Sequence, residues 1–317
     1  MRVIVTGADG FVGRFLVRHL LETGHSVTGA LHAGAEGLRS WLTAAEWGAV
    51  RWVPLELADR ASVDSLAGAP SDGIVHLAGL ASNAAARKDP GAAWDANAGG
   101  TARLVDAAAR TVAEGRGNPV VIVVSSGEVY GRGGTRPFLE SDPALPHSPY
   151  AASKVGAEVA ALEAWRRAGL RVVVARPFTH TGPGQTTAYV VPALAERLTR
   201  AREAGERAVP TGNLDPVRDM LDVRDVVRAY VLLLESGVAG ETYNIARGEG
   251  VRLRDVFARI ARLAGSDARP EADPALARSA DIPYLVGDPA KLVGATGWSP
   301  SYSLDDTLRD VLNAQAH

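Results

Sequence analysis

The sequence predicts a doubly wound α/β fold, in which a parallel sheet is covered by helices on both faces, with a smaller C-terminal α/β lobe. Short β-branched runs alternate with segments of helical hydrophobic periodicity through the first 178 residues. A glycine-rich turn directly follows the first of these runs. The alternation weakens after residue 178. We therefore assign residues 1–178 to the sheet domain, with 222–246 returning to it, and residues 179–221 and 247–317 to the second lobe.

The composition is typical of a globular protein that acts on a small molecule. Hydrophobic residues make up 46% and charged residues 22% of the 317 positions, and the formal charge is −2. Such a balance gives no electrostatic reason to expect nucleic acid or an anionic membrane as partner. There is no cysteine, which excludes disulfides and thiolate chemistry, and no metal site is predicted. No signal peptide and no membrane-spanning apolar run are recognisable, so we expect a cytoplasmic protein.

The first unit reads as strand, turn and helix. A β-branched strand over residues 2–6 leads into glycines at positions 7, 10 and 13, and helical periodicity then runs up to Gly24. Glycines in this context allow a tight turn and a close approach of ligand to backbone, while the helix N-terminus offers free N–H groups to a pyrophosphate. We interpret the turn as the dinucleotide-binding element of a Rossmann fold.

The end of the second strand, at residues 26–31, bears on the choice of cofactor. An acidic residue there usually binds the ribose 2′-hydroxyl of NAD. This chain has Gly29-Ala30-Leu31-His32 instead. Because no carboxylate repels a 2′-phosphate, and because His32 or Arg39 can approach one, the sequence favours NADP over NAD.

The remaining elements follow from periodicity and from turn residues. In the sheet domain we predict strands at 51–55, 73–77, 120–124 and 171–175, and helices at 92–113 and from Tyr150 to near Gly169. Beyond it we predict helices at 189–204, 223–235 and 253–264, a strand at 241–245 and a turn at 218–222.

Candidate catalytic residues lie after the strand at 120–124 and at the start of the long helix. Tyr150 and Lys154 are four residues apart, so they share one helix face. We expect the ammonium to favour the phenolate and to lower the tyrosine pKa toward neutrality. Ser126 follows the strand end, where ligands of parallel sheets bind, and Ser125 is the alternative hydroxyl. His76 is a further candidate, for which a structural role is favoured.

These motifs together resemble the extended short-chain dehydrogenases/reductases that act on nucleotide sugars, and the resemblance covers the whole chain. It implies that Tyr150 is the acid/base, that Lys154 binds the nicotinamide ribose and tunes the tyrosine, and that Ser126 binds the reacting oxygen. Asn97 resembles a structural asparagine of the family. The resemblance also implies the following sites. Cofactor-binding residues are Gly7, Gly10, Phe11, Val12, Gly13, His32, Leu57, Leu77, Ala78, Gly79, Tyr150, Lys154 and Pro177; substrate-binding residues are Ser126, Glu128, Thr179, Val190, Arg218 and Arg278.

Within that family, several stretches are most similar to GDP-6-deoxy-4-keto-mannose reductases. They include Arg176-Pro177-Phe178, Gly182-Pro183-Gly184-Gln185 and residues 222–230. By this resemblance Arg218 and Arg278 hold the substrate diphosphate, as guanidinium groups can. Two positions depart from the pattern: Thr179 replaces the usual asparagine, and Gly127 stands where dehydratases carry an acid or serine. The second departure disfavours dehydration.

The expected function is therefore NAD(P)H-dependent 4-keto reduction of a nucleotide-activated 4-keto-6-deoxyhexose, with Tyr150 as general acid. Two alternatives stay open: a nucleotide-sugar 4-epimerase that keeps NAD tightly bound, and a non-catalytic dinucleotide-binding protein. The resemblance also implies a homodimer through the helices at 92–113 and 150–168. Small residues would permit close helix approach there, between subunits or within one: Ala151, Ala152, Gly156, Ala157 and Ala160.

Overall fold

The computed structural model describes residues 1–32, 41–276 and 282–315. Within these residues, seven parallel strands form one sheet in the order β11-β6-β5-β4-β1-β2-β3. The strands are β1 (Arg2–Thr6), β2 (Ser26–Leu31), β3 (Val50–Pro54), β4 (Gly73–His76), β5 (Val120–Val124), β6 (Arg171–Pro177) and β11 (Thr242–Ile245). The chain winds outward from β1 in one direction and from β4 in the other. Ligands of such sheets bind where the order reverses, beyond the strand ends of β1 and β4.

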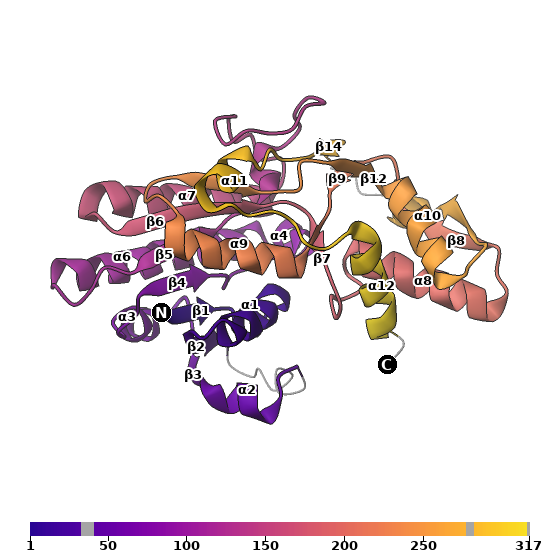
Figure 1. Ribbon diagram of the computed structural model, residues 1–317. Helices are drawn as coiled ribbons and strands as arrows, with labels where there is room; N and C mark the ends of the chain where they lie inside the picture. Colours follow the sequence, from indigo (N-terminus) through magenta and orange to yellow (C-terminus); the bar gives the residue numbers. More distant parts are fainter. Residues whose placement is uncertain (33–40, 277–281, 316–317) are drawn as a thin grey trace.

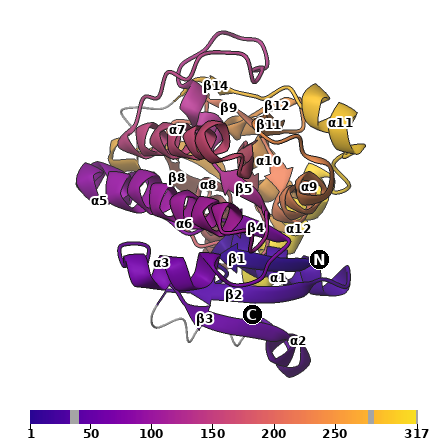
Figure 2. The same cartoon turned by 90° about the vertical axis from the view of Figure 1, so that its left-hand side faces the viewer.

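Helices cover both faces of the sheet (Figures 1 and 2). One face carries α1 (Phe11–Glu22), α9 (Val223–Ser236) and α11 (Ala290–Thr296), and the other carries α3 (Arg60–Ala67), α6 (Gly100–Ala113) and α7 (Pro149–Ala168). Side chains of β1 alternate accordingly, since Val3 and Val5 join the first core and Ile4 the second. The predicted doubly wound α/β fold is confirmed.

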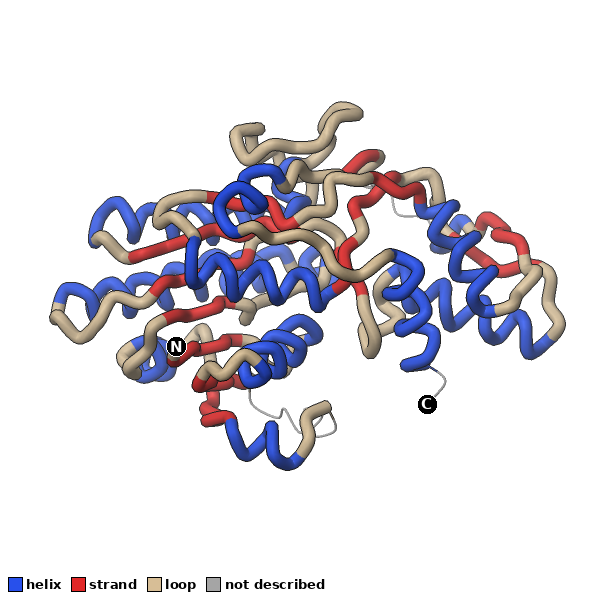
Figure 3. The backbone as a smooth tube through the Cα atoms, viewed as in Figure 1, coloured by secondary structure: helices blue, strands red, loops and turns tan. Residues whose placement is uncertain are grey.

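A third hydrophobic core lies outside the sheet. Figure 3 shows the helices and strands that build it to one side of the sheet. It is built from α8 (Val190–Ala204), α10 (Leu253–Ala264) and α12 (Leu304–Gln315), beside the parallel pair β8 (Ala208–Thr211) and β13 (Arg269–Ala272). Three short strands connect this part to the sheet, in the order β12 (Gly250–Arg252), β9 (Val217–Asp219) and β14 (Tyr284–Leu285).

The prediction of a turn at 218–222 is wrong. Those residues lie in β9 and in β10 (Leu221–Asp222), and β10 pairs with β7 (His180–Thr181). The pairing partners are more than 30 residues away in the chain, since Asp219 pairs with Gly250 and Leu221 with His180. Local sequence patterns therefore do not reveal these two-to-three-residue strands.

The helix predicted at 92–113 consists of three successive segments. These are α5 (Pro90–Trp94), the π-helical η2 (Asp95–Gly99) and α6. Asn97, inside η2, bonds the backbone of Leu80 in both directions and also donates to the Ser153 hydroxyl, at 2.9 to 3.0 Å. These hydrogen bonds are made from the segment in which the helix widens to a π-helical turn. Such turns occur frequently at functional sites.

Two helices of only six residues escaped the sequence-based prediction: α2 (Ala44–Ala49) and α4 (Asn83–Lys88). Neither spans two full turns, so hydrophobic periodicity cannot mark them. In the described part of the chain, no helix combines the length and the apolar character that crossing a membrane requires.

Candidate active site

The turn between β1 and α1 leaves no room for a side chain at Gly7 or Gly13. Gly7 has a φ of +66°, and a Cβ there would lie 2.8 Å from the Ala78 nitrogen. A Cβ on Gly13 would lie 2.2 Å from the Gly7 oxygen. The helix begins after Gly10 without a side-chain cap, so its first N–H groups are available to a ligand. The turn therefore fits the pyrophosphate of a dinucleotide.

The end of β4 is fixed by a buried hydrogen-bond network around His76. The Thr101 hydroxyl donates to the Asn97 carbonyl at 2.6 Å, so it accepts from Nε2 of His76 at 3.2 Å. Nδ1 then accepts from the Thr6 hydroxyl at 2.8 Å, and that hydroxyl accepts from the Ala78 N–H at 3.1 Å. Burial lowers the pKa of His76 to about 3. His76 is thus a neutral structural residue that positions the Leu77-Ala78-Gly79 backbone beside the glycine turn.

Ser126, Tyr150 and Lys154 come together beyond the ends of the central strands. The Ser126 hydroxyl hydrogen-bonds the Tyr150 phenol. Nζ of Lys154 lies 6.0 Å from the centre of the Tyr150 ring and donates to the Val124 carbonyl at 2.9 Å. The alternative hydroxyl, Ser125, is buried with no hydrogen-bond partner for its oxygen among the described residues. The structure thus brings Ser126, rather than Ser125, to the phenol.

The expectation that Lys154 lowers the pKa of Tyr150 is wrong for this structure. Burial raises the pKa of the phenol, the Glu128 carboxylate raises it further, and only the hydrogen bond from Ser126 opposes them. Burial also lowers the pKa of Lys154 itself, to about 8, against the attraction of Glu158. The phenol is therefore protonated at neutral pH, which suits a proton donor.

Two further residues reach this site without having been predicted. Nδ2 of Asn83 lies 2.9 Å from each oxygen of Glu128 and fixes that carboxylate near Tyr150. Tyr189, which caps α8, has a pKa raised by burial and then by the charge of Glu128. Asn83 opens the short helix α4 and Tyr189 precedes α8. Neither belongs to a sequence motif, so only the folded chain reveals them.

Other predicted residues lie away from the catalytic group. Nη1 of Arg218 donates to the carbonyls of Val217 and Ile282, at 2.9 and 2.7 Å, and so joins β9 to the segment that precedes β14. Nε2 of His32 lies 3.4 Å from a carboxylate oxygen of Glu56, which the sequence had not suggested as a neighbour. Arg39 and Arg278 lie outside the described residues.

The remaining predicted positions belong to loops and element ends around the crevice. Leu57 packs against Gly100, where an added Cβ would lie 2.9 Å from the leucine side chain. Pro177 ends β6 and is buried. The Thr179 carbonyl accepts from the Leu221 N–H at 2.9 Å, and Val190 is the first residue of α8.

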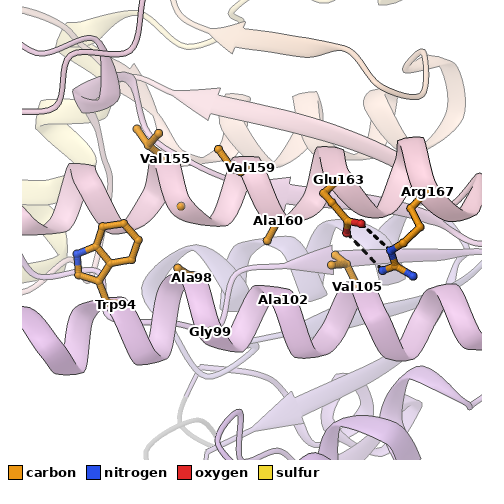
Figure 4. A pocket seen from close by; sticks show the side chains of 11 residues that line it. Trp94, Ala98, Gly99, Ala102, Val105, Val155, Val159, Ala160, Glu163 and Arg167 are labelled. Atoms are coloured by element: carbon orange, nitrogen blue, oxygen red, sulfur yellow. Dashed lines mark hydrogen bonds and ion pairs between the residues drawn. The ribbon is translucent and has the colours of Figure 1, made fainter.

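A separate apolar groove runs along the outer face of α5, η2, α6 and α7 (Figure 4). Its volume is about 640 Å³. Trp94 and Val159 line it while 46% and 63% exposed, and Gly156 and Ala160 also line it, whereas Ala151 and Ala157 are buried within the chain. The full lining is Trp94, Ala98, Gly99, Ala102, Val105, Val155, Gly156, Val159, Ala160, Glu163 and Arg167. The predicted catalytic residues Ser126, Tyr150 and Lys154 do not line it.

Comparison with known proteins gives concordant matches. Residues 4–311 match the family model described as GDP-mannose 4,6 dehydratase. A GDP-6-deoxy-D-mannose reductase from Pseudomonas aeruginosa is 32% identical over 98% of this chain and 96% of its own. A UDP-glucose 4-epimerase from Mycolicibacterium smegmatis is 33% identical over 97% of this chain and 96% of its own. The structure of RMD from Pseudomonas aeruginosa complexed with NADPH superposes with a TM-score of 0.81, at 31% identity, covering 99% of this chain and 98% of that one.

Proposed function

We propose a 4-ketoreductase function for this chain, which belongs to the GDP-mannose 4,6-dehydratase family of extended short-chain dehydrogenases/reductases. Members of this group are enzymes that use a nicotinamide dinucleotide to act on nucleotide sugars, and so is this chain. The substrate we propose is a nucleoside-diphosphate 4-keto-6-deoxyhexose of the GDP-4-keto-6-deoxymannose type. The reductase relative at 32% identity supports this choice.

The chain's own residues supply the proton and the electrostatic support for reduction. A nicotinamide bound at the glycine turn would supply the hydride for C4 of the sugar. Tyr150 donates its proton to the oxygen at C4, on which negative charge develops, and Ser126 donates a hydrogen bond to the same oxygen. The raised pKa of Tyr150 keeps the phenol protonated until this step. Lys154 is held by the Val124 carbonyl, with Nζ 6.0 Å from the centre of the Tyr150 ring.

The packing of Gly127 is the observation that separates reduction from dehydration. A Cβ at this position would lie 3.0 Å from the ring of Phe178, which is 2% exposed. An acidic side chain next to Ser126 would therefore displace a buried aromatic ring. At the position where dehydratases carry an acid or a serine, any side chain here would require the Phe178 ring to shift by a few tenths of an ångström. This supports a reductase that leaves the C6 substituent intact.

NADP is the cofactor we propose, held at the glycine turn. His32, and not an acid, follows β2, and the RMD structure that superposes with this chain is a complex with NADPH. A carboxylate oxygen of Glu56 lies 3.4 Å from His32. The negative charge of Glu56 would repel a 2′-phosphate and so weakens the preference for NADP.

The nucleotide sugar is proposed to lie between the two parts of the chain. Residues 1–178 and 222–246 form the dinucleotide-binding domain in this proposal, and residues 179–221 and 247–317 form the nucleotide-sugar lobe. Arg218 is the proposed diphosphate contact in that lobe, because its guanidinium suits phosphate oxygens.

A panel of nucleoside-diphosphate 4-keto-6-deoxyhexoses, assayed with NADPH and with NADH, tests the function. We expect oxidation of NADPH with a GDP-linked 4-keto-6-deoxyhexose, tighter binding of NADPH than of NADH, and a 6-deoxyhexose product identified by NMR. The rival activity predicts a different result: turnover of UDP-galactose without added cofactor, with NAD retained through purification, would establish an epimerase and reject the reductase.

A homodimer through the apolar groove is the proposed assembly. Trp94 and Val159 leave a large apolar surface exposed along two adjacent helices, which is unusual unless a partner covers it. A second copy of the same face would cover it symmetrically. A Cβ at Gly156 would lie 2.6 Å from the Trp94 ring, so the absence of a side chain there makes room for that ring at the groove.

Val159→Glu is expected to convert the dimer to a monomer, because it places a charge in the centre of the proposed interface. Sedimentation velocity at micromolar concentration measures the change. Val238→Glu is the matched control, since Val238 is 58% exposed and lies outside the groove. A wild-type monomer, or a Val159→Glu dimer of undiminished stability, would rule this interface out.

A further inference from the structure

The face of α7 that carries the catalytic pair continues into a buried carboxylate. Tyr150, Lys154 and Glu158 follow one another at intervals of four residues and so lie on one side of the helix. Lys154 and Glu158 are 8% and 5% exposed. Buried charges are costly unless they are paired, so their partners decide which charge states persist.

Glu158 is paired with Arg176, the penultimate residue of the neighbouring strand β6. Nε and Nη2 of Arg176 donate to the two carboxylate oxygens at 2.8 and 2.6 Å, in the two-pronged arrangement that makes such pairs strong. The guanidinium also lies 4.8 Å from the centre of the Tyr130 ring, and the Tyr130 hydroxyl donates to Asn244 at 2.7 Å. Arg176 is therefore held in place from both sides.

The carboxylate of Glu158 thus acts on two cations, Arg176 at contact distance and Lys154 one helical turn away. Its charge raises the pKa of Lys154 against the larger effect of burial. The other groups that face Lys154 are the protonated phenol of Tyr150 on the same helix, the neutral His76 on β4 and the Val124 carbonyl on β5. Glu128 acts on the phenol rather than on Lys154.

We propose that the Glu158–Arg176 pair controls the charge state of Lys154. Glu158 stabilises the ammonium, and Arg176, by neutralising most of that carboxylate, limits the stabilisation. Both are positioning residues, because they act through Lys154 and contact neither the phenol nor Ser126. The catalytic consequence rests on the proposed function, but the electrostatic control itself does not.

Lysine titration in the intact protein tests this directly, because the chain has only three lysines, at positions 88, 154 and 291. Side-chain NMR of lysine-labelled protein follows each ammonium with pH, and Lys88→Arg and Lys291→Arg assign the signals. We expect Lys154 to titrate near pH 8 in the wild type. In Glu158→Gln its pKa should fall by about one unit or more, and in Arg176→Gln it should rise by a similar amount.

Under charge control, the Lys154 pKa shifts in opposite directions in the two variants. Under a purely structural role, both variants would disturb the site and shift that pKa in the same direction. Removing one partner of a buried pair can prevent folding, so the double variant Glu158→Gln/Arg176→Gln is measured as well. It leaves neither buried charge without its partner, and its Lys154 should titrate below the wild type. An unchanged pKa in the double variant, or shifts of equal sign in the single variants, would overturn the proposal.

The pH profile of kcat/KM then connects the inference to turnover. The alkaline limb should move with the Lys154 pKa, downward in Glu158→Gln and upward in Arg176→Gln. Shifted lysine titrations in a protein that reduces no keto sugar would leave the charge control standing and reject the proposed function instead.

Discussion

Tyr150→Phe is expected to lower kcat/KM for the keto sugar by about 10² to 10⁴-fold, the range of a positioned general acid. The phenol is the group whose hydroxyl meets Ser126 and whose raised pKa keeps a proton available at neutral pH. Phenylalanine fills the same volume but donates no proton to the C4 oxygen. Loss of NADPH absorbance with the GDP-linked substrate measures the effect.

Cofactor affinity is the control for that variant. NADPH titrations followed by fluorescence should give dissociation constants within a few fold of the wild type, because the glycine turn is untouched. Tyr243→Phe removes a buried phenol that accepts from the Val238 N–H, away from Ser126, and should retain activity. If Tyr150→Phe kept wild-type turnover, another group would have to supply the proton and the mechanism would need a different acid.

Gly13→Ala is expected to abolish tight cofactor binding. The added Cβ would sit 2.2 Å from the Gly7 carbonyl oxygen and 2.7 Å from Cα of Ala8, both of them backbone atoms that cannot rotate away. The start of α1 must therefore move off the turn, which misplaces the N–H groups that face the pyrophosphate. Overpacking costs about 1–3 kcal/mol, so we expect affinity for NADPH to fall by roughly tenfold to a hundredfold and the melting temperature to fall as well.

Gly48→Ala provides the matched control for that substitution. Gly48 lies inside α2, and a Cβ there meets nothing within 4 Å. Alanine in a helix is favoured over glycine by about 0.5–1 kcal/mol, so this variant should bind NADPH normally and melt no lower than the wild type. Equal loss of NADPH binding in both variants would show that the effect is general and not a property of the turn.

Local sequence patterns predicted the strands of the large sheet and most of its long helices, but they missed the helices α3, α11 and α12. The β-branched runs of β1, β2 and β5 and the periodicity of α1, α8 and α10 predicted these elements to within about two residues. Such patterns are informative because an element that is buried on one or both faces needs apolar residues at regular positions along a continuous stretch of sequence. They failed for β9 and β10, whose partners β12 and β7 are contributed by other parts of the chain.

The sequence by itself determined the doubly wound sheet and the glycine turn, because both depend on residue types at fixed local spacing. It also predicted the Ser126, Tyr150 and Lys154 set, in which only Tyr150 and Lys154 are close in sequence. Only the tertiary structure decided the electrostatics of that set. Tyr150 is four residues from Lys154 in sequence, yet burial and Glu128 govern its pKa, and Lys154 responds to burial and Glu158. Desolvation and charge act through space. The spacing of residues along the sequence therefore could not have given the direction of these pKa shifts.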